Sequence, residues 1–144
     1  MTLPEEHRQS PFVELIGGKT EEFREGYVRL SVRLRERHTN PNGVMHGGVI
    51  TTLMDEALGG VIASVRGMEA MWAAPHATVD MNVSFLSGAR PGDDVIVEGR
   101  VLKVGRSVAF GEAEARRRGE DALIAKGRFT FTILRSNKRS ADGR

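Results

Sequence analysis

The sequence predicts an α+β fold in which an antiparallel sheet wraps around one long central helix. Several short segments alternate apolar and polar residues, which is the period of a strand with one buried face. Residues 47–65 instead repeat their apolar side chains in adjacent pairs every four positions, which is typical of a helix buried over most of its circumference. At 144 residues the chain is long enough for one domain and too short for two ordinary ones.

The first two predicted elements along the chain are a strand and the long helix. Residues 27–35 alternate strictly, and the apolar positions are Val28, Leu30, Val32 and Leu34. The helix at 47–65 also carries small residues that let other backbone approach closely, namely Ala57, Gly59, Gly60, Ala63 and Ser64. A mostly buried helix in so short a chain indicates one sheet wrapped around it.

Four further strands are predicted at 77–85, 95–104, 108–115 and 124–133. The first of them alternates Ala77, Val79, Met81, Val83 and Phe85 on one side. Gly, Pro, Asp and Ser residues occupy the three connections between these strands. Because the connections are short, we expect largely antiparallel pairing.

The composition is that of a soluble globular protein, with 40% hydrophobic and 28% charged residues. We expect no spanning helix, because no apolar run approaches the roughly 20 residues that a bilayer requires. Residues 1–10 lack the apolar stretch of a secretory signal, so a cytoplasmic location is expected. There is no cysteine, which excludes thiolate nucleophiles and cysteine-containing zinc sites.

The basic residues concentrate at the C-terminus. Residues 135–144 carry a net charge of +3, whereas the whole chain has a net charge of +2. The rest of the chain therefore has a net charge of −1. The remaining residues of this tail are polar and cannot bury apolar surface, which predicts a solvated, disordered end. A weak contact with an acidic partner is the alternative, and the distribution does not favour nucleic-acid binding.

The start of the predicted helix is the first candidate site. Gly47 and Gly48 leave backbone N–H groups uncovered at a helix N-terminus, where the helix dipole favours a developing negative oxygen. An oxyanion hole is therefore chemically plausible, with Gly48 placed beside the substrate. The alternative is that the two glycines form only a tight turn.

Asp55 lies on a polar stripe of the same helix. A carboxylate on an otherwise apolar helix destabilises it unless the group is paired, solvated or functional, and a solvent-facing edge is the alternative. Eight residues separate Gly47 from Asp55, which is roughly 12 Å along a helix. The two cannot act on one carbonyl within one chain. If both are catalytic, a second subunit supplies one of them, which predicts a dimer about a two-fold axis.

The run from Asn40 to Gly48, with Asp55 nine positions after His46, resembles the signature of hotdog-fold acyl-CoA thioesterases of the phenylacetate-pathway type. Residues 78–86 and the turn at 103–106 match as well. The resemblance runs from about residue 12 to residue 134, so residues 1–134 are assigned to one hotdog domain. It implies hydrolysis of a small or medium acyl-CoA, aromatic ones included, to free acid and CoA, by dimers that often pair into tetramers.

The resemblance also implies roles for individual residues. The N–H of Gly47 would bind the thioester oxygen, and Asp55 of the opposite subunit would act as nucleophile or as general base for water. Asn40 corresponds to a residue near the reacting carbonyl, His46 to one that supports the oxyanion side, and Thr78 to one that helps to hold the water. No cofactor is implied, because CoA is part of the substrate.

Three further residues are candidate substrate contacts. Trp72 lies in an apolar segment that we interpret as a loop lining the acyl pocket, or else as a subunit contact. Lys103 and Arg106 are candidates for the CoA phosphates, although ordinary solvated charge is the alternative. The histidines lack ligand-like spacing, so no metal site is expected.

Two other functions use the same fold. A hotdog hydratase or dehydratase pairs a histidine with a carboxylate on a differently spaced motif, and Asp55 nine residues after His46 argues against it. A non-catalytic acyl-CoA sensor would keep the pocket, and Asp55 in register argues for catalysis instead.

Overall fold

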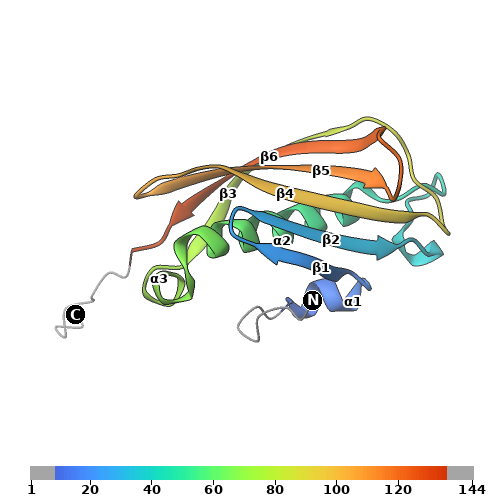
Figure 1. Cartoon of the computed structure of the whole chain (residues 1–144). Helices are drawn as coiled ribbons and strands as arrows, with labels where there is room; N and C mark the ends of the chain where they lie inside the picture. Colours follow the sequence, from blue (N-terminus) through green and yellow to red (C-terminus); the bar gives the residue numbers. More distant parts are fainter. Residues whose placement is uncertain (1–8, 136–144) are drawn as a thin grey trace, which may run out of the picture.

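One six-stranded sheet packs against one long helix in the computed structural model, which describes residues 9–135 (Figure 1). All pairings between neighbouring strands are antiparallel, and the strand order is β1-β2-β4-β5-β6-β3. The elements in chain order are α1 (Pro11–Leu15), β1 (Lys19–Arg24), β2 (Tyr27–Arg33), the 3-10 turn η1 (Glu36–His38), α2 (Gly47–Arg66), α3 (Met68–Ala73), β3 (His76–Phe85), β4 (Asp94–Val104), β5 (Val108–Arg117) and β6 (Leu123–Ile133). The predicted fold class is confirmed.

Helix α2 has a clear physical beginning and end. The His46 side chain caps its first turn by accepting a hydrogen bond from the Gly48 N–H. Gly67, with a φ of 82°, ends it, because this backbone conformation favours glycine. Between them lies a face of fully buried side chains, which includes Leu53, Met54 and Leu58.

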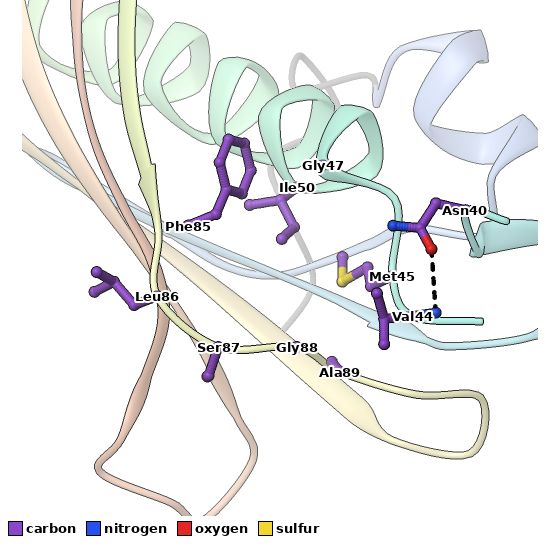
Figure 2. A pocket seen from close by; sticks show the side chains of 10 residues that line it. All are labelled: Asn40, Val44, Met45, Gly47, Ile50, Phe85, Leu86, Ser87, Gly88 and Ala89. Carbon is purple, nitrogen blue, oxygen red and sulfur yellow. Dashed lines mark hydrogen bonds between the residues drawn. The ribbon is translucent and has the colours of Figure 1, made fainter. Parts of the chain in front are cut away.

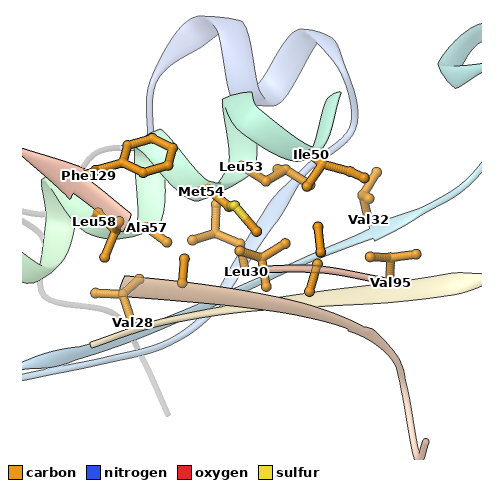
Figure 3. Close-up of a cluster of buried hydrophobic side chains, with 14 of the residues drawn as sticks. Val28, Leu30, Val32, Ile50, Leu53, Met54, Ala57, Leu58, Val95 and Phe129 are labelled. Atoms are coloured by element: carbon orange, nitrogen blue, oxygen red, sulfur yellow. The ribbon is translucent and has the colours of Figure 1, made fainter. Parts of the chain in front are cut away.

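The sheet approaches this helix very closely (Figure 3). A Cβ atom at Gly111 would lie 2.7 Å from the Leu58 side chain, and one at Gly99 would lie 3.1 Å from it. The missing side chains therefore let the strands meet the helix, while Phe129 and Leu30 are fully buried in the same core. Burial of each such large side chain contributes about 1.5–3 kcal/mol.

Strand β3 differs from the expectation in its partner and in its exposure. It does not pair with the strand that follows it; it crosses to β6 and forms one edge of the sheet. A bulge lies between Thr78 and Asp80, so the alternation of 77–85 changes phase at Val79. The prediction of one buried apolar face is therefore wrong, since Val79 is 59% exposed and Met81 is 47% exposed.

Several elements lie outside the sequence predictions. Neither α1, β1 nor α3 was expected, and β1 is a charged strand at the opposite edge of the sheet. The interpretation of the segment around Trp72 as a loop is wrong, because it forms helix α3. The predicted disordered tail at 135–144 lies outside the described residues except for Arg135.

Length and composition alone would also allow α2 to cross a membrane, with 20 residues and a mean hydropathy of 1.4. The lack of a continuous apolar run, on which the expectation of no spanning helix rested, therefore does not by itself exclude one. The apolar side chains of α2 pack against the sheet, however, and this core accounts for the hydropathy of the helix.

Candidate active site

A pocket of about 470 Å³ opens where the chain enters α2 (Figure 2). One wall is the segment leading into the helix, and the other is the end of β3 with the residues that follow it. Its lining residues are Asn40, Val44, Met45, Gly47, Ile50, Phe85, Leu86, Ser87, Gly88 and Ala89. Most of these side chains are apolar, so the pocket suits the apolar part of a ligand.

Asn40 is held in one orientation by the loop that it begins. Its Oδ1 accepts hydrogen bonds from the N–H groups of Asn42 at 2.9 Å and Val44 at 3.3 Å. Both partners are donors, so they identify the amide oxygen and leave the NH₂ group to face a substrate. The Asn40 backbone N–H also donates to the Val44 carbonyl, which closes the loop.

The two glycines at the helix start are not equivalent. The Gly48 N–H donates to Nδ1 of His46 at 2.8 Å and is therefore occupied, which corrects the expectation that both N–H groups are uncovered. The Gly47 N–H makes no hydrogen bond to any residue between 9 and 135. The ring of Phe85 lies 3.1 Å from the position that a Cβ of residue 47 would occupy. Gly47 is thus the free donor at this helix N-terminus.

Asp55 is fixed by a residue of β3. Oγ1 of Thr78 donates a hydrogen bond to Oδ1 of Asp55 at 2.6 Å, across 23 positions of sequence. Both residues are half-buried. Oδ1 is therefore engaged, and Oδ2 makes no hydrogen bond to any residue that the structure describes, which leaves it available to accept a proton.

The geometry separates this carboxylate from the pocket. Helix α2 is continuous from Gly47 to Arg66, so its rise places Asp55 roughly 12 Å along the axis from Gly47. Asp55 and Thr78 do not line the pocket. One chain therefore presents two separate candidate half-sites, the free N–H of Gly47 and the carboxylate of Asp55.

The sequence of the region that builds both half-sites matches a family model. The model describes the thioesterase superfamily, and it matches residues 42–124, more than half of the chain. The chain belongs to the thioesterase superfamily. This membership confirms the predicted hotdog fold and the predicted class of enzyme, a thioester hydrolase.

Individual relatives of this thioesterase agree with the family. Acyl-coenzyme A thioesterase 13 of Homo sapiens is 35% identical over 106 residues, which cover 73% of this chain and 71% of that protein. A putative esterase of Pseudomonas aeruginosa is 33% identical over 127 residues, covering 88% of this chain and 90% of its own length. Among solved structures, zebra fish thioesterase superfamily member 2 is 31% identical and has a TM-score of 0.75, covering 87% of this chain and 88% of that chain.

Three predicted substrate contacts of the thioesterase lie away from its pocket. Trp72 is 82% exposed on α3. Lys103 and Arg106 are exposed at the β4–β5 turn, at the end of the sheet where β3 begins. Within the single chain, none of the three meets Gly47 or Asn40 in the pocket.

Other residues at or near the site were given no role from the sequence. Phe85 and Leu86 form a pocket wall, and their signals were the apolar end of the predicted strand and the match of residues 78–86 to the family. His76 lies near Asp55 although it is isolated from other histidines in sequence. The described residues contain no group of three or more His, Cys, Asp or Glu side chains that could hold a metal ion.

Proposed function

We propose that this thioesterase hydrolyses acyl-CoA with a small or medium acyl group, aromatic groups included, to the free acid and CoA. The observation that carries the proposal is the pair of half-sites on α2, a free Gly47 N–H and an Asp55 carboxylate held by Thr78. The name of the Homo sapiens relative, an acyl-coenzyme A thioesterase, supports the substrate class.

The proposed chemistry needs one hydrogen-bond donor and one carboxylate. The thioester oxygen binds the Gly47 N–H, which stabilises the negative charge that develops during attack on the carbonyl. On the other side, Asp55 either attacks the carbonyl itself or takes a proton from water that does so. The carbon–sulfur bond then breaks, and CoA leaves as a thiolate that needs little acid assistance. Asn40 directs its NH₂ group at the bound thioester, and His46 holds the first turn through Gly48.

We propose further that each reaction centre is shared by two subunits. A second copy, with its α2 antiparallel to the first, brings its Asp55 to the Gly47 of the neighbour. Strand β3 supports this arrangement because it is an edge strand with exposed Val79 and Met81, which two copies would cover on pairing. Exposed apolar side chains on the outer face of β4 and β5, Leu102, Val108 and Phe110, are candidates for joining two dimers into a tetramer.

The direct test is release of free thiol from a panel of acyl-CoA substrates, followed with a thiol reagent. We expect hydrolysis of short, medium and aromatic acyl groups, with no added metal or cofactor. The matched control is Asp55→Asn, which keeps the shape of the side chain and its hydrogen bond to Thr78 but removes the charge.

Two outcomes would refute this function. An Asp55→Asn protein as active as the parent would show that Asp55 is neither nucleophile nor base, as expected for a sensor with adventitious activity. Hydration of an enoyl-CoA without release of thiol would assign the chain to the hydratases instead.

A further inference from the structure

His76 and Thr78 both face helix α2 from the start of β3. They are two positions apart on a strand, ahead of the bulge, so their side chains point to the same side. Their counterparts on the helix, Asp55 and Gly59, are one turn apart. Thr78 meets Asp55 through a hydrogen bond, and Nε2 of His76 lies 3.7 Å from the position of a Cβ at Gly59. The imidazole therefore lies one helical turn beyond the carboxylate.

The contacts of His76 come from three elements. Nδ1 lies 3.0 Å from the sulfur of Met71 on α3. The ring packs edge-on against Phe131 of β6, with the centroids 5.4 Å apart and an angle of 88° between the planes. The third element is α2, at Gly59, where the absence of a side chain leaves room for the ring. The side chain is thus wedged at the junction of α2, α3 and the sheet.

The charged groups that act on His76 lie on α2. Burial lowers the pKa of His76 below its ordinary value of 6.5, and the positive charge of Arg66 lowers it further. A backbone hydrogen bond to Gly59 and the negative charge of Asp55 oppose this shift. Among the described residues, α3 and β6 contact the His76 ring through Met71 and Phe131. Neither element contributes a charge that shifts the pKa of His76. His76 is therefore neutral at neutral pH.

We propose that His76 is a positioning residue for Asp55. When neutral, His76 holds the start of β3 against α2, and when protonated it makes the Asp55 carboxylate a weaker base. The neutral ring keeps Thr78 in place over Oδ1 of Asp55. Protonation of His76 adds a positive charge that acts on Asp55. Since the charge of Asp55 favours the protonated imidazole, the imidazolium must favour the ionised, less basic carboxylate by the same amount. The catalytic consequence rests on the proposed function of Asp55, whereas the coupling of the two charges does not.

The first experiment compares the pH dependence of kcat/KM for the parent and for His76→Phe, which fills the space without titrating. In the parent we expect a loss of about fivefold or more as His76 becomes protonated below pH 6.5, in kcat rather than in KM. The His76→Phe protein should retain activity at pH 8 and lack this step. Identical profiles for the two proteins would overturn the proposal.

Arg66→Gln provides a matched control, because Arg66 acts on the same imidazole from the end of α2. Removing its charge should raise the pKa of His76 and move the step that His76 causes to higher pH. In the His76→Phe background the same change should leave the profile where it is. A shift of equal size in both backgrounds would mean that Arg66 acts on the reaction without His76, and would refute the proposal.

A second experiment reads the coupling without any substrate. The chain has only 4 histidines, so the imidazole resonance of His76 can be assigned by NMR from the signal that His76→Phe removes. Asp55→Asn should lower the pKa of His76 further, because it removes the charge that raises it. An unchanged pKa would overturn the proposal. A lowered pKa in a protein that hydrolyses no acyl-CoA would support the coupling and refute only the proposed function.

Discussion

Thr78 is the residue on which the orientation of Asp55 depends. Its hydroxyl donates to the carboxylate at 2.6 Å, and a hydrogen bond to a charged group contributes about 1.5–3 kcal/mol. We expect Thr78→Val, which keeps the shape but lacks the donor, to lower kcat roughly tenfold to a hundredfold.

The matched variant is Thr78→Ser, which keeps the hydroxyl and loses only a methyl group. It should retain most of the parent activity in the same thiol-release assay. Equal losses in the two variants would mean that Thr78 acts through packing and not through its hydrogen bond.

At the scale of single residues, geometry was predictable where it is local. The separation of Gly47 from Asp55 follows from the pattern of one helix, because the spacing along a helix fixes distance. The hydrogen bond from the Gly48 N–H to the His46 side chain was not predicted, because it depends on the rotamer of a capping side chain. The position of His76 beside Gly59 was also missed, since it depends on how a strand and a helix distant in sequence are packed.

At the scale of the element, the first residue of α2 offers a direct test of the oxyanion donor. Gly47→Pro removes the N–H but suits the first helical position, because the preceding His46 has an extended backbone with φ −62° and ψ 132°. We expect kcat to fall on the order of a hundredfold or more while the helix still forms.

Gly47→Ala is the control for crowding. It introduces the same Cβ, 3.1 Å from the ring of Phe85, but keeps the N–H. The difference between the two variants isolates the donor, and circular dichroism checks that both fold. A proline variant as active as the alanine variant would rule out the Gly47 N–H as the oxyanion donor.

The long helix and five of the strands were predictable because each carries a strong period in its apolar residues. Strand β1 was not, because its residues Lys19–Arg24 are largely charged and polar and only the neighbouring strand defines it. The bulge in β3 was hidden for a related reason. The apolar residues of 77–85 alternate through it without interruption, and only the register with β6 reveals the extra residue.

For the whole molecule, the separation of the two half-sites predicts complementation between inactive variants. Asp55→Asn and Gly47→Pro are each expected to be inactive as homodimers. A mixed dimer contains one centre with both defects and one with neither, so random mixing should restore about a quarter of the parent activity. The measurement is thiol release after the two proteins are unfolded and refolded together.

The control is the same treatment applied to each variant alone. If the mixed protein stays as inactive as each variant alone, the Gly47 N–H and the Asp55 carboxylate act within the same subunit. That outcome would contradict the sharing of the site between subunits.

The arrangement of the whole sheet was only partly accessible from the sequence. Short connections predict antiparallel neighbours, and this holds for β4, β5 and β6. The segment from Leu86 to Asp93 breaks the rule by leading from one edge of the sheet to its interior. Nothing in its turn residues distinguishes a hairpin from such a crossing, because Gly, Pro and Asp suit both.

The bulge at Val79 makes the length of β3 as important as its composition. Thr78 contacts Asp55 before the bulge, and Phe85 lies beside Gly47 after it. The extra residue of the bulge therefore brings both side chains to the same face of the sheet. Deleting or inserting a single residue between them would turn one of the two side chains to the opposite face of the sheet. Natural variation in chain length is therefore expected in the exposed turns, and not within this strand.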